Sequence, residues 1–161
     1  MAGRVLALHA KGVPPPGEHG IQKPNRPELS VTAQGVDGDF NRFRTEKLAG
    51  DLDSALLLIP IETIRGLNAE GWPVRDGDLG ENITTEGVAY DALAPEGEWR
   101  IGTVVARTTR ACEPCHYLHD LPYVGTARGA EFVRTMIGRR GWYARVVTPG
   151  RIRVGDPIER L

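Results

Sequence analysis

Cys112, Cys115 and His116 form the pattern C-x-x-C-H within the stretch TTRACEPCHYL at 108–118. These two cysteines are the only ones in the sequence. Thiols and an imidazole at this spacing suit covalent haem attachment, half of a zinc site, a redox-active dithiol or one nucleophilic thiolate. A fifth interpretation assigns them no chemistry and treats both cysteines as small buried hydrophobic residues.

The haem and zinc interpretations need partners that this stretch does not supply. Covalent haem attachment normally occurs outside the cytoplasm, and the apolar run from Val5 to Leu8 is shorter than the ~7–15 residues of an export signal. We therefore expect no haem. A closed zinc site uses four cysteine or histidine ligands, so the remaining form is an open site made of Cys112, Cys115 and His119.

A redox dithiol of the thioredoxin kind lies at the N-terminus of a helix that follows a strand. A strand is predicted before the cysteines, but the segment after them is short and interrupted by Pro122. Arg107 and Arg110 favour a single working thiolate instead, because cationic neighbours stabilise the form that attacks or binds metal. From these residues alone, the working cysteine and the inert buried pair both stay open.

The composition is that of an ordinary globular protein. The chain has 161 residues, of which 40% are hydrophobic and 25% charged, and its formal net charge is −1. Such a charge gives no general attraction to nucleic acid or to a membrane surface, and no apolar stretch approaches the ~20 residues of a membrane span. We therefore expect one domain over residues 1–161, located in the cytoplasm, where thiols stay reduced.

Glycine and proline interrupt the chain about every 10–15 residues, which predicts many short strands with irregular connections. The strands are expected at 3–9, 29–34, 54–61 and 99–110, with two more over 142–159. The run at 54–61 is apolar throughout, which indicates a strand buried on both faces. Helices are expected at 61–71 and 128–138, and a long proline-rich loop at 11–27. Because the helices do not alternate with the strands, a mostly-β barrel or sandwich is favoured over a doubly wound sheet.

Three phrases, in this order along the chain, resemble the MOSC domain family, which is named for the C-terminal domain of molybdenum cofactor sulfurases. They are GVDGDFN at 35–41, GDLGENITTEGV at 77–88 and TRACEPCHYL at 109–118. The second phrase is the most specific, and the resemblance continues to the closing GRIRVGDPI. The match is to small members without a pyridoxal-phosphate domain, so that cofactor is not expected. The resemblance implies a MOSC-type β-barrel with one cysteine in a pocket.

By this resemblance, the family's cysteine corresponds to Cys115, which would carry sulfur as a persulfide or ligate molybdenum in a molybdopterin cofactor. Cys112 would be a second, helping thiol. The family covers sulfur transfer and reduction of N-hydroxylated compounds, so the implied partners are a small-molecule or cofactor ligand and a sulfur-donor protein such as a cysteine desulfurase. The alternatives are a non-catalytic module that binds cofactor or metal, and a thiol-based reductase or carbon–sulfur lyase that works without molybdenum.

Two departures from the family pattern concern proton transfer. Many relatives have G-D-x-H in the first phrase, where this chain ends in Asn41, and asparagine cannot shuttle protons near neutral pH. Many also have a histidine before a later glycine-aspartate pair, where this chain reads LAGD at 48–51. The available substitutes are His19, His116 and His119, and we expect His116 to take part in catalysis.

Several cationic side chains are candidates for contact with an anionic cofactor. Arg110 is the one that we expect to bind an anion, with Arg42 and Arg44 as further candidates. Lys23 and Arg26 lie in the proline-rich loop and would reach a phosphate if this loop folds over the pocket. Otherwise they are solvated surface residues.

The glycine-rich phrases add four polar candidates. Glu81 and Asn82 would orient the pocket through hydrogen bonds, and Thr84 would bond to backbone or ligand. Asp39 follows a glycine-rich turn in the same way as Glu81. The alternative for Asp39 and Glu81 is turn chemistry alone, because turns use Asp, Asn and Gly for their backbone conformation.

Overall fold

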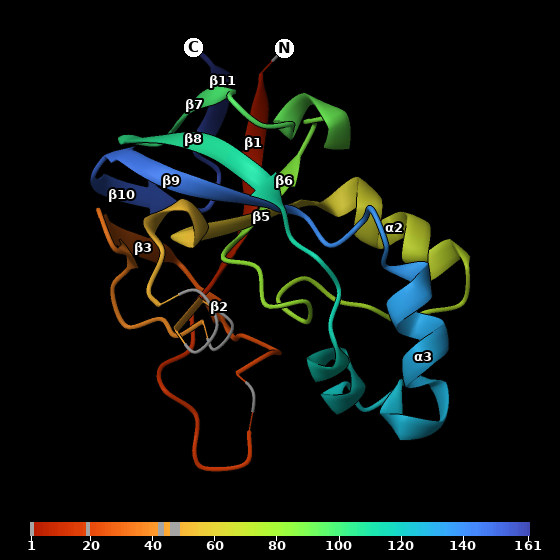
Figure 1. Ribbon diagram of the computed structural model, residues 1–161. Coiled ribbons are helices and arrows are strands. Elements are labelled where there is room, and N and C mark those ends of the chain that lie inside the picture. The colour runs from red at the N-terminus through yellow and green to blue at the C-terminus, as the bar shows by residue number, and fades with distance from the viewer. Residues whose placement is uncertain (1, 19, 42–43, 46–48) are drawn as a thin grey trace.

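The computed structural model describes residues 2–18, 20–41, 44–45 and 49–161 (Figure 1). In these residues seven strands form a ring, and the pairing of the first with the last closes it into a barrel. In ring order they are β11 (Pro157–Arg160), β7 (Glu98–Ile101), β8 (Val104–Ala111), β9 (Trp142–Thr148), β5 (Leu56–Pro60), β6 (Ile83–Glu86) and β1 (Gly3–His9). The expectation of a mostly-β barrel with a few short helices is confirmed.

Four shorter strands extend this framework. β10 (Gly150–Arg153), β3 (Glu28–Thr32) and β4 (Gly35–Val36) form a second sheet, and β2 (Asn25–Arg26) pairs with the end of β1. The second sheet contains the start of the phrase at 35–41, because β4 forms its first two residues.

Two α-helices and a short helical segment cover one side of the barrel (Figure 1). They are α2 (Ile61–Ala69), α3 (Gly125–Thr135) and the 3-10 helix η3 (His116–Asp120). α2 buries Ile61, Ile64 and Leu67, which recur at helical spacing and form its apolar face. None of the helices in the described part of the chain has the length and apolarity needed to cross a membrane.

β5 connects the two hydrophobic cores of the molecule. All five of its residues are buried, which confirms the prediction of a strand covered on both faces. Leu56 and Leu58 belong to the core inside the barrel, whereas Ile59 packs in the second core, between the barrel and the helices. Leu57 joins neither core and packs with Cys112 and Tyr143 instead.

The structure corrects the limits of several predicted elements. The strand expected at 99–110 is a hairpin, because the chain reverses at Gly102, whose φ of +58° lies in the left-handed region. The glycine-rich phrase at 77–88, where no strand was predicted, contains β6, which runs parallel to β5. The C-terminal segment forms three strands (β9, β10 and β11) instead of two.

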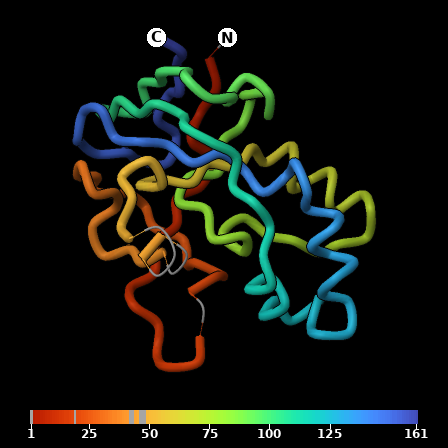
Figure 2. Tube along the Cα trace, viewed as in Figure 1, coloured from red at the N-terminus to blue at the C-terminus, as the bar shows by residue number. Residues whose placement is uncertain are grey.

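The two ends of the barrel differ. The N- and C-termini lie together at one end, where β1 pairs with β11 (Figure 1). The loop after β1 and the segment after β8 leave from the other end and extend in the same direction (Figure 2). The cysteines follow β8 directly, so this second end carries the candidate site.

Candidate functional site

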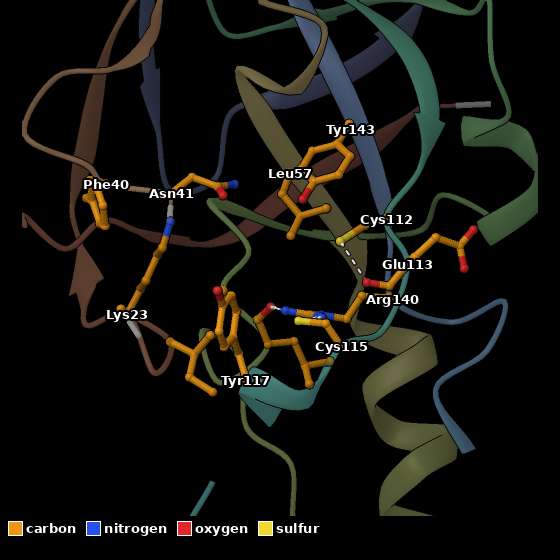
Figure 3. Close-up of a pocket in the computed structure, with 14 residues that line it drawn as sticks. Lys23, Phe40, Asn41, Leu57, Cys112, Glu113, Cys115, Tyr117, Arg140 and Tyr143 are labelled. Atoms are coloured by element: carbon orange, nitrogen blue, oxygen red, sulfur yellow. Dashed lines mark hydrogen bonds between the residues drawn. The ribbon is translucent and has the colours of Figure 1, made fainter. Parts of the chain in front are cut away.

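A pocket of about 490 Å³, partly continuous with solvent, opens at this end of the barrel (Figure 3). Both cysteines line it. Lys23 reaches it from the proline-rich loop, and Tyr143 from the start of β9. Arg140, from the turn before β9, completes the polar side of the wall. The structure thus brings together residues that are far apart in the sequence around two thiols.

Cys115 is the more accessible of the two thiols. It is half-buried and directly precedes η3. Nη1 of Arg140 lies 4.0 Å from its Sγ atom, and Figure 3 shows the two groups side by side. The carbonyl oxygen of Leu79 fixes this guanidinium by accepting hydrogen bonds from Nε at 3.1 Å and Nη2 at 2.9 Å. A buried positive charge therefore lies beside the sulfur.

Arg140 keeps its charge although its side chain is buried. Burial would lower the pKa of Arg140, but Cys112 and Cys115 raise it through the negative charge that they carry when ionised, and the net direction is upward. Its exposed fraction is 6%, so solvent screens the charge little.

Cys112 has a different environment from Cys115. It packs against Leu57 and Tyr143 with an exposed fraction of 5%, and its Sγ lies 3.9 Å from the carbonyl oxygen of Glu113. Burial raises the pKa of Cys112 and also that of Tyr143. Cys112 is thus a neutral thiol in the floor of the pocket.

Arg110, the arginine expected beside the cysteine, points elsewhere. Its Nη2 donates to Asp51 Oδ2 at 2.9 Å and to Ser54, and it does not line the pocket. The arginine that the structure brings to Cys115 is Arg140, which the sequence analysis missed. Two adjacent arginines between glycines at 138–141 gave no local signal that one of them would be buried.

The histidines lie outside the pocket in the part of the chain that the structure describes. His116 is exposed, with its ring centroid 4.4 Å from that of Tyr117. His119 packs closely against Gly129 of α3, and His19 lies outside the described residues. Asn41 lines the pocket.

Lys23 and Asp39 form a buried ion pair at the edge of the pocket. Lys23 Nζ lies 2.8 Å from Asp39 Oδ2, and the two side chains are 3% and 9% exposed. Asn82 donates to the same oxygen at 2.9 Å and accepts from the backbone N–H of Leu57 at 3.2 Å. Asn82 and Asp39 therefore hold Lys23 against the barrel.

Glu81 and Thr84 lie behind the pocket wall and do not line it. Glu81 is fully buried, and Thr84 donates to it at 3.4 Å. The Oγ1 atom of Thr84 is 3.0 Å from Nε2 of the buried His9. Burial, strengthened by the carboxylates of Asp76 and Asp78, raises the pKa of Glu81 to about 7, and burial lowers that of His9.

The other cationic candidates of the sequence analysis are spread over the surface. Arg26 donates to the carbonyl oxygen of Ala10 at 3.4 Å, and Arg44 to that of Gln34 at 2.6 Å. Arg42 lies outside the described residues, as does residue 48 of the LAGD stretch.

The side chains around the two thiols determine what kind of metal site the pocket could form. Among the described residues, no three His, Cys, Asp or Glu side chains gather into a metal site, so Cys112, Cys115 and His119 do not form the open zinc site considered from the sequence. A single accessible sulfur with open space in front of it fits a metal that brings its other ligands in an organic cofactor. The donor set therefore fits a cofactor-borne metal.

Fold and site together define a class of protein: a mostly-β domain whose barrel carries an accessible thiol at one end. The sequence profile of the MOSC domain matches residues 45–159. Because this match covers most of the chain, the protein belongs to the MOSC domain family. A search of curated proteins gave no match.

Solved structures share this fold along nearly the whole chain. YuaD from Bacillus subtilis is 17% identical, with a TM-score of 0.79 over 98% of this chain and 94% of that one. YiiM from Geobacillus stearothermophilus is 22% identical, with a TM-score of 0.74 over 99% and 75%. YiiM from Escherichia coli is 20% identical, with a TM-score of 0.66 over 98% and 69%.

Proposed function

We propose that the pocket binds a molybdopterin cofactor, that the thiolate of Cys115 is the protein ligand of its molybdenum, and that the protein reduces a small molecule there. One observation carries this proposal: the half-buried Cys115 faces open space, with Arg140 4.0 Å from its sulfur. When bound, the molybdenum would supply two-electron redox chemistry. We place the protein in the cytoplasm, where a free thiol persists, and treat residues 1–161 as one domain.

The residues of the pocket have separate tasks in this proposal. Arg140 places a positive charge beside the sulfur of Cys115, and such a charge suits a metal-binding thiolate. Leu57, Cys112 and Tyr143 form a tightly packed floor, which excludes water from behind the sulfur. The side chain of Tyr117 adds an aromatic wall, which suits a flat heterocycle such as a pterin.

Persulfide transfer is the second candidate, and the pairing of the cations favours it. Lys23 is held by Asp39, and Arg140 by Leu79, so these two pocket cations already have partners without a cofactor phosphate. The thiolate of Cys115 would attack the outer sulfur of a persulfide on a donor protein such as a cysteine desulfurase. A new sulfur–sulfur bond forms, the donor's bond breaks, and the donor leaves as a thiolate without net oxidation.

One set of variants tests both candidates. The wild type, Cys115→Ala and Cys112→Ala are purified from a host that makes the cofactor, and bound molybdenum and pterin are measured. We expect molybdenum in the wild type and in Cys112→Ala, and its loss from Cys115→Ala. Molybdenum without reductase activity would favour a module that stores or delivers the cofactor.

The same three proteins, incubated with a sulfur donor, are then weighed by intact-mass spectrometry. Gain of one sulfur atom by the wild type but not by Cys115→Ala would support the persulfide candidate. Equal gain by Cys115→Ala would assign the sulfur to Cys112. A wild type that binds no molybdenum and gains no sulfur would overturn both candidates.

A further inference from the structure

We infer that Glu81 is a positioning residue for Cys115: its buried carboxylate fixes the turn at 77–79, and the Leu79 carbonyl of this turn holds Arg140 against the sulfur. This inference rests on the proposed role of Cys115 as a reactive thiolate. It makes specific the pocket-orienting role that the sequence suggested for Glu81, and it assigns no ligand contact, because a fully buried side chain behind the pocket wall cannot touch a ligand.

The first step runs from the carboxylate to the turn. Glu81 accepts the backbone N–H of Gly77 with Oε1 and that of Leu79 with Oε2, the latter at 3.2 Å. Gly77 has a φ of +88°, a conformation that most other residues avoid. One carboxylate therefore satisfies two buried backbone donors. It adds to the backbone hydrogen bonds of this turn, in which Gly80 N–H donates to the carbonyl oxygen of Gly77 at 3.3 Å.

The second step runs from the turn to the sulfur. Two nitrogen atoms of Arg140 share the carbonyl oxygen of Leu79, and the third, Nη1, is directed at Cys115. The side chain of Leu79 is fully buried in the second core. A shift of this carbonyl would therefore turn the guanidinium and change its distance from the sulfur.

Stability alone gives little reason for a carboxylate at this place. Glu81 has no ion pair within the described residues, and the charged side chains that act on its pKa, Asp76 and Asp78, have the same sign. Thr84 separates it from His9. A buried carboxylate without a cation is costly. We therefore attribute its presence to its two oxygen atoms, which accept the backbone N–H groups of the turn.

Alkylation of Cys115 by iodoacetamide at pH 8.5 tests the inference, because Glu81, whose pKa is raised to about 7, is a carboxylate at this pH. The reaction is run in a Cys112→Ala background, so that Cys115 is the thiol whose rate is measured. The rates are compared for the parent, Glu81→Gln, Arg140→Ala and the double variant. Because Gln keeps only one acceptor oxygen, we expect Glu81→Gln and Arg140→Ala each to slow the reaction about 3–10-fold. If Glu81 acts through Arg140, the double variant is no slower than Arg140→Ala alone.

Two further variants keep the test decisive. Glu81→Asp retains the charge but is one methylene shorter, and it replaces Glu81→Gln in the test if Glu81→Gln does not fold. We expect it to slow the alkylation as well, with no further slowing when it is combined with Arg140→Ala. Ile152→Val removes a methyl group from the barrel core and controls for general destabilisation; it should leave the rate unchanged. An unchanged rate in folded Glu81→Gln or Glu81→Asp, losses that multiply in the double variant, or an equal loss in Ile152→Val would each overturn the inference.

The measurement needs neither molybdenum nor a sulfur donor. If the wild type binds no molybdenum and gains no sulfur, the proposed function fails while the coupling between Glu81 and Arg140 can still be observed. If molybdenum binds but the coupling is absent, only the positioning role fails.

Discussion

Nη1 of Arg140 and Sγ of Cys115 lie 4.0 Å apart although the residues are 25 positions apart in the sequence. The two groups come from different parts of the fold: Cys115 precedes η3, and Arg140 lies in the turn that leads into β9. Their approach depends on the packing of η3 and α3 over the barrel. The fold thus supplies the cation that the cysteine stretch itself does not place beside the thiol.

Replacement of Arg140 should slow the chemistry of Cys115, whereas replacement of Arg110 should not. Arg140→Ala removes the charge beside the sulfur, and we expect alkylation of Cys115 at pH 7 to slow about 3–10-fold. Arg110 pairs with Asp51, so Arg110→Ala is the matched control and should react like the wild type. The rates are measured with iodoacetamide and mass spectrometry. A slower Arg110→Ala and an unaffected Arg140→Ala would reverse this assignment.

The two thiols should differ in reactivity in the native protein. Cys115 is half-buried and faces the pocket, whereas Cys112 is 5% exposed and burial raises its pKa. With limiting iodoacetamide under native conditions, we expect the label on Cys115, located by fragmentation of the peptide that holds both residues. In denaturant both should react. Faster native labelling of Cys112 would contradict the environments described above.

The fold was predictable at those strands whose local sequence is itself typical of a strand. The apolar run of β5 and the β-branched residues of β8 indicated strands directly. β6 was missed because its sequence, ITTE at 83–86, has no apolar alternation, and its threonines are buried only through tertiary packing. Barrel closure joins Gly3 to Ile158 across the whole chain, and no local pattern reports such a pairing.

The candidate site was predictable only in part. The motif residues Asp39, Glu81 and Asn82 all lie close to the pocket, yet hydrogen bonds turn them toward the framework. Arg139 and Arg140 show why the rest was hidden. They are neighbours in sequence, but Arg139 forms an exposed ion pair with Glu70, whereas Arg140 is buried. Which of two identical residues faces the core is decided by the helices packed around them.

The free energy of unfolding should depend strongly on the buried ion pair between Lys23 and Asp39. Asp39→Ala leaves a buried ammonium group without its partner, and we expect it to cost about 3–5 kcal/mol of the free energy of unfolding. Asp37 is exposed two residues earlier, so Asp37→Ala is the control and should change stability by less than about 0.5 kcal/mol. Urea denaturation measures both. The double variant Lys23→Met with Asp39→Ala should recover much of the loss, and equal losses in the single and double variants would contradict the pairing.

Glu81 should make the stability of the protein fall as pH rises through neutrality. Its pKa is raised from 4.5 to about 7, so between these values the folded protein holds a proton that the unfolded chain releases. The stabilisation from this group is complete below pH 4.5 and is lost as pH rises through about 7. The lowered pKa of His9 acts in the opposite direction, because its contribution is lost as pH falls.

Comparison with Glu81→Gln isolates the carboxylate, because His9 is present in both proteins and Gln does not titrate. We expect the stability of the wild type relative to Glu81→Gln to decrease by about 1–3 kcal/mol from pH 5 to pH 8. Urea denaturation at several pH values measures this difference. Glu131→Gln, on the exposed face of α3, controls for the loss of a surface carboxylate and should give a flat difference. A flat difference for Glu81→Gln would mean that Glu81 keeps one charge state in this range, and an increase would mean that the carboxylate is stabilised in the fold.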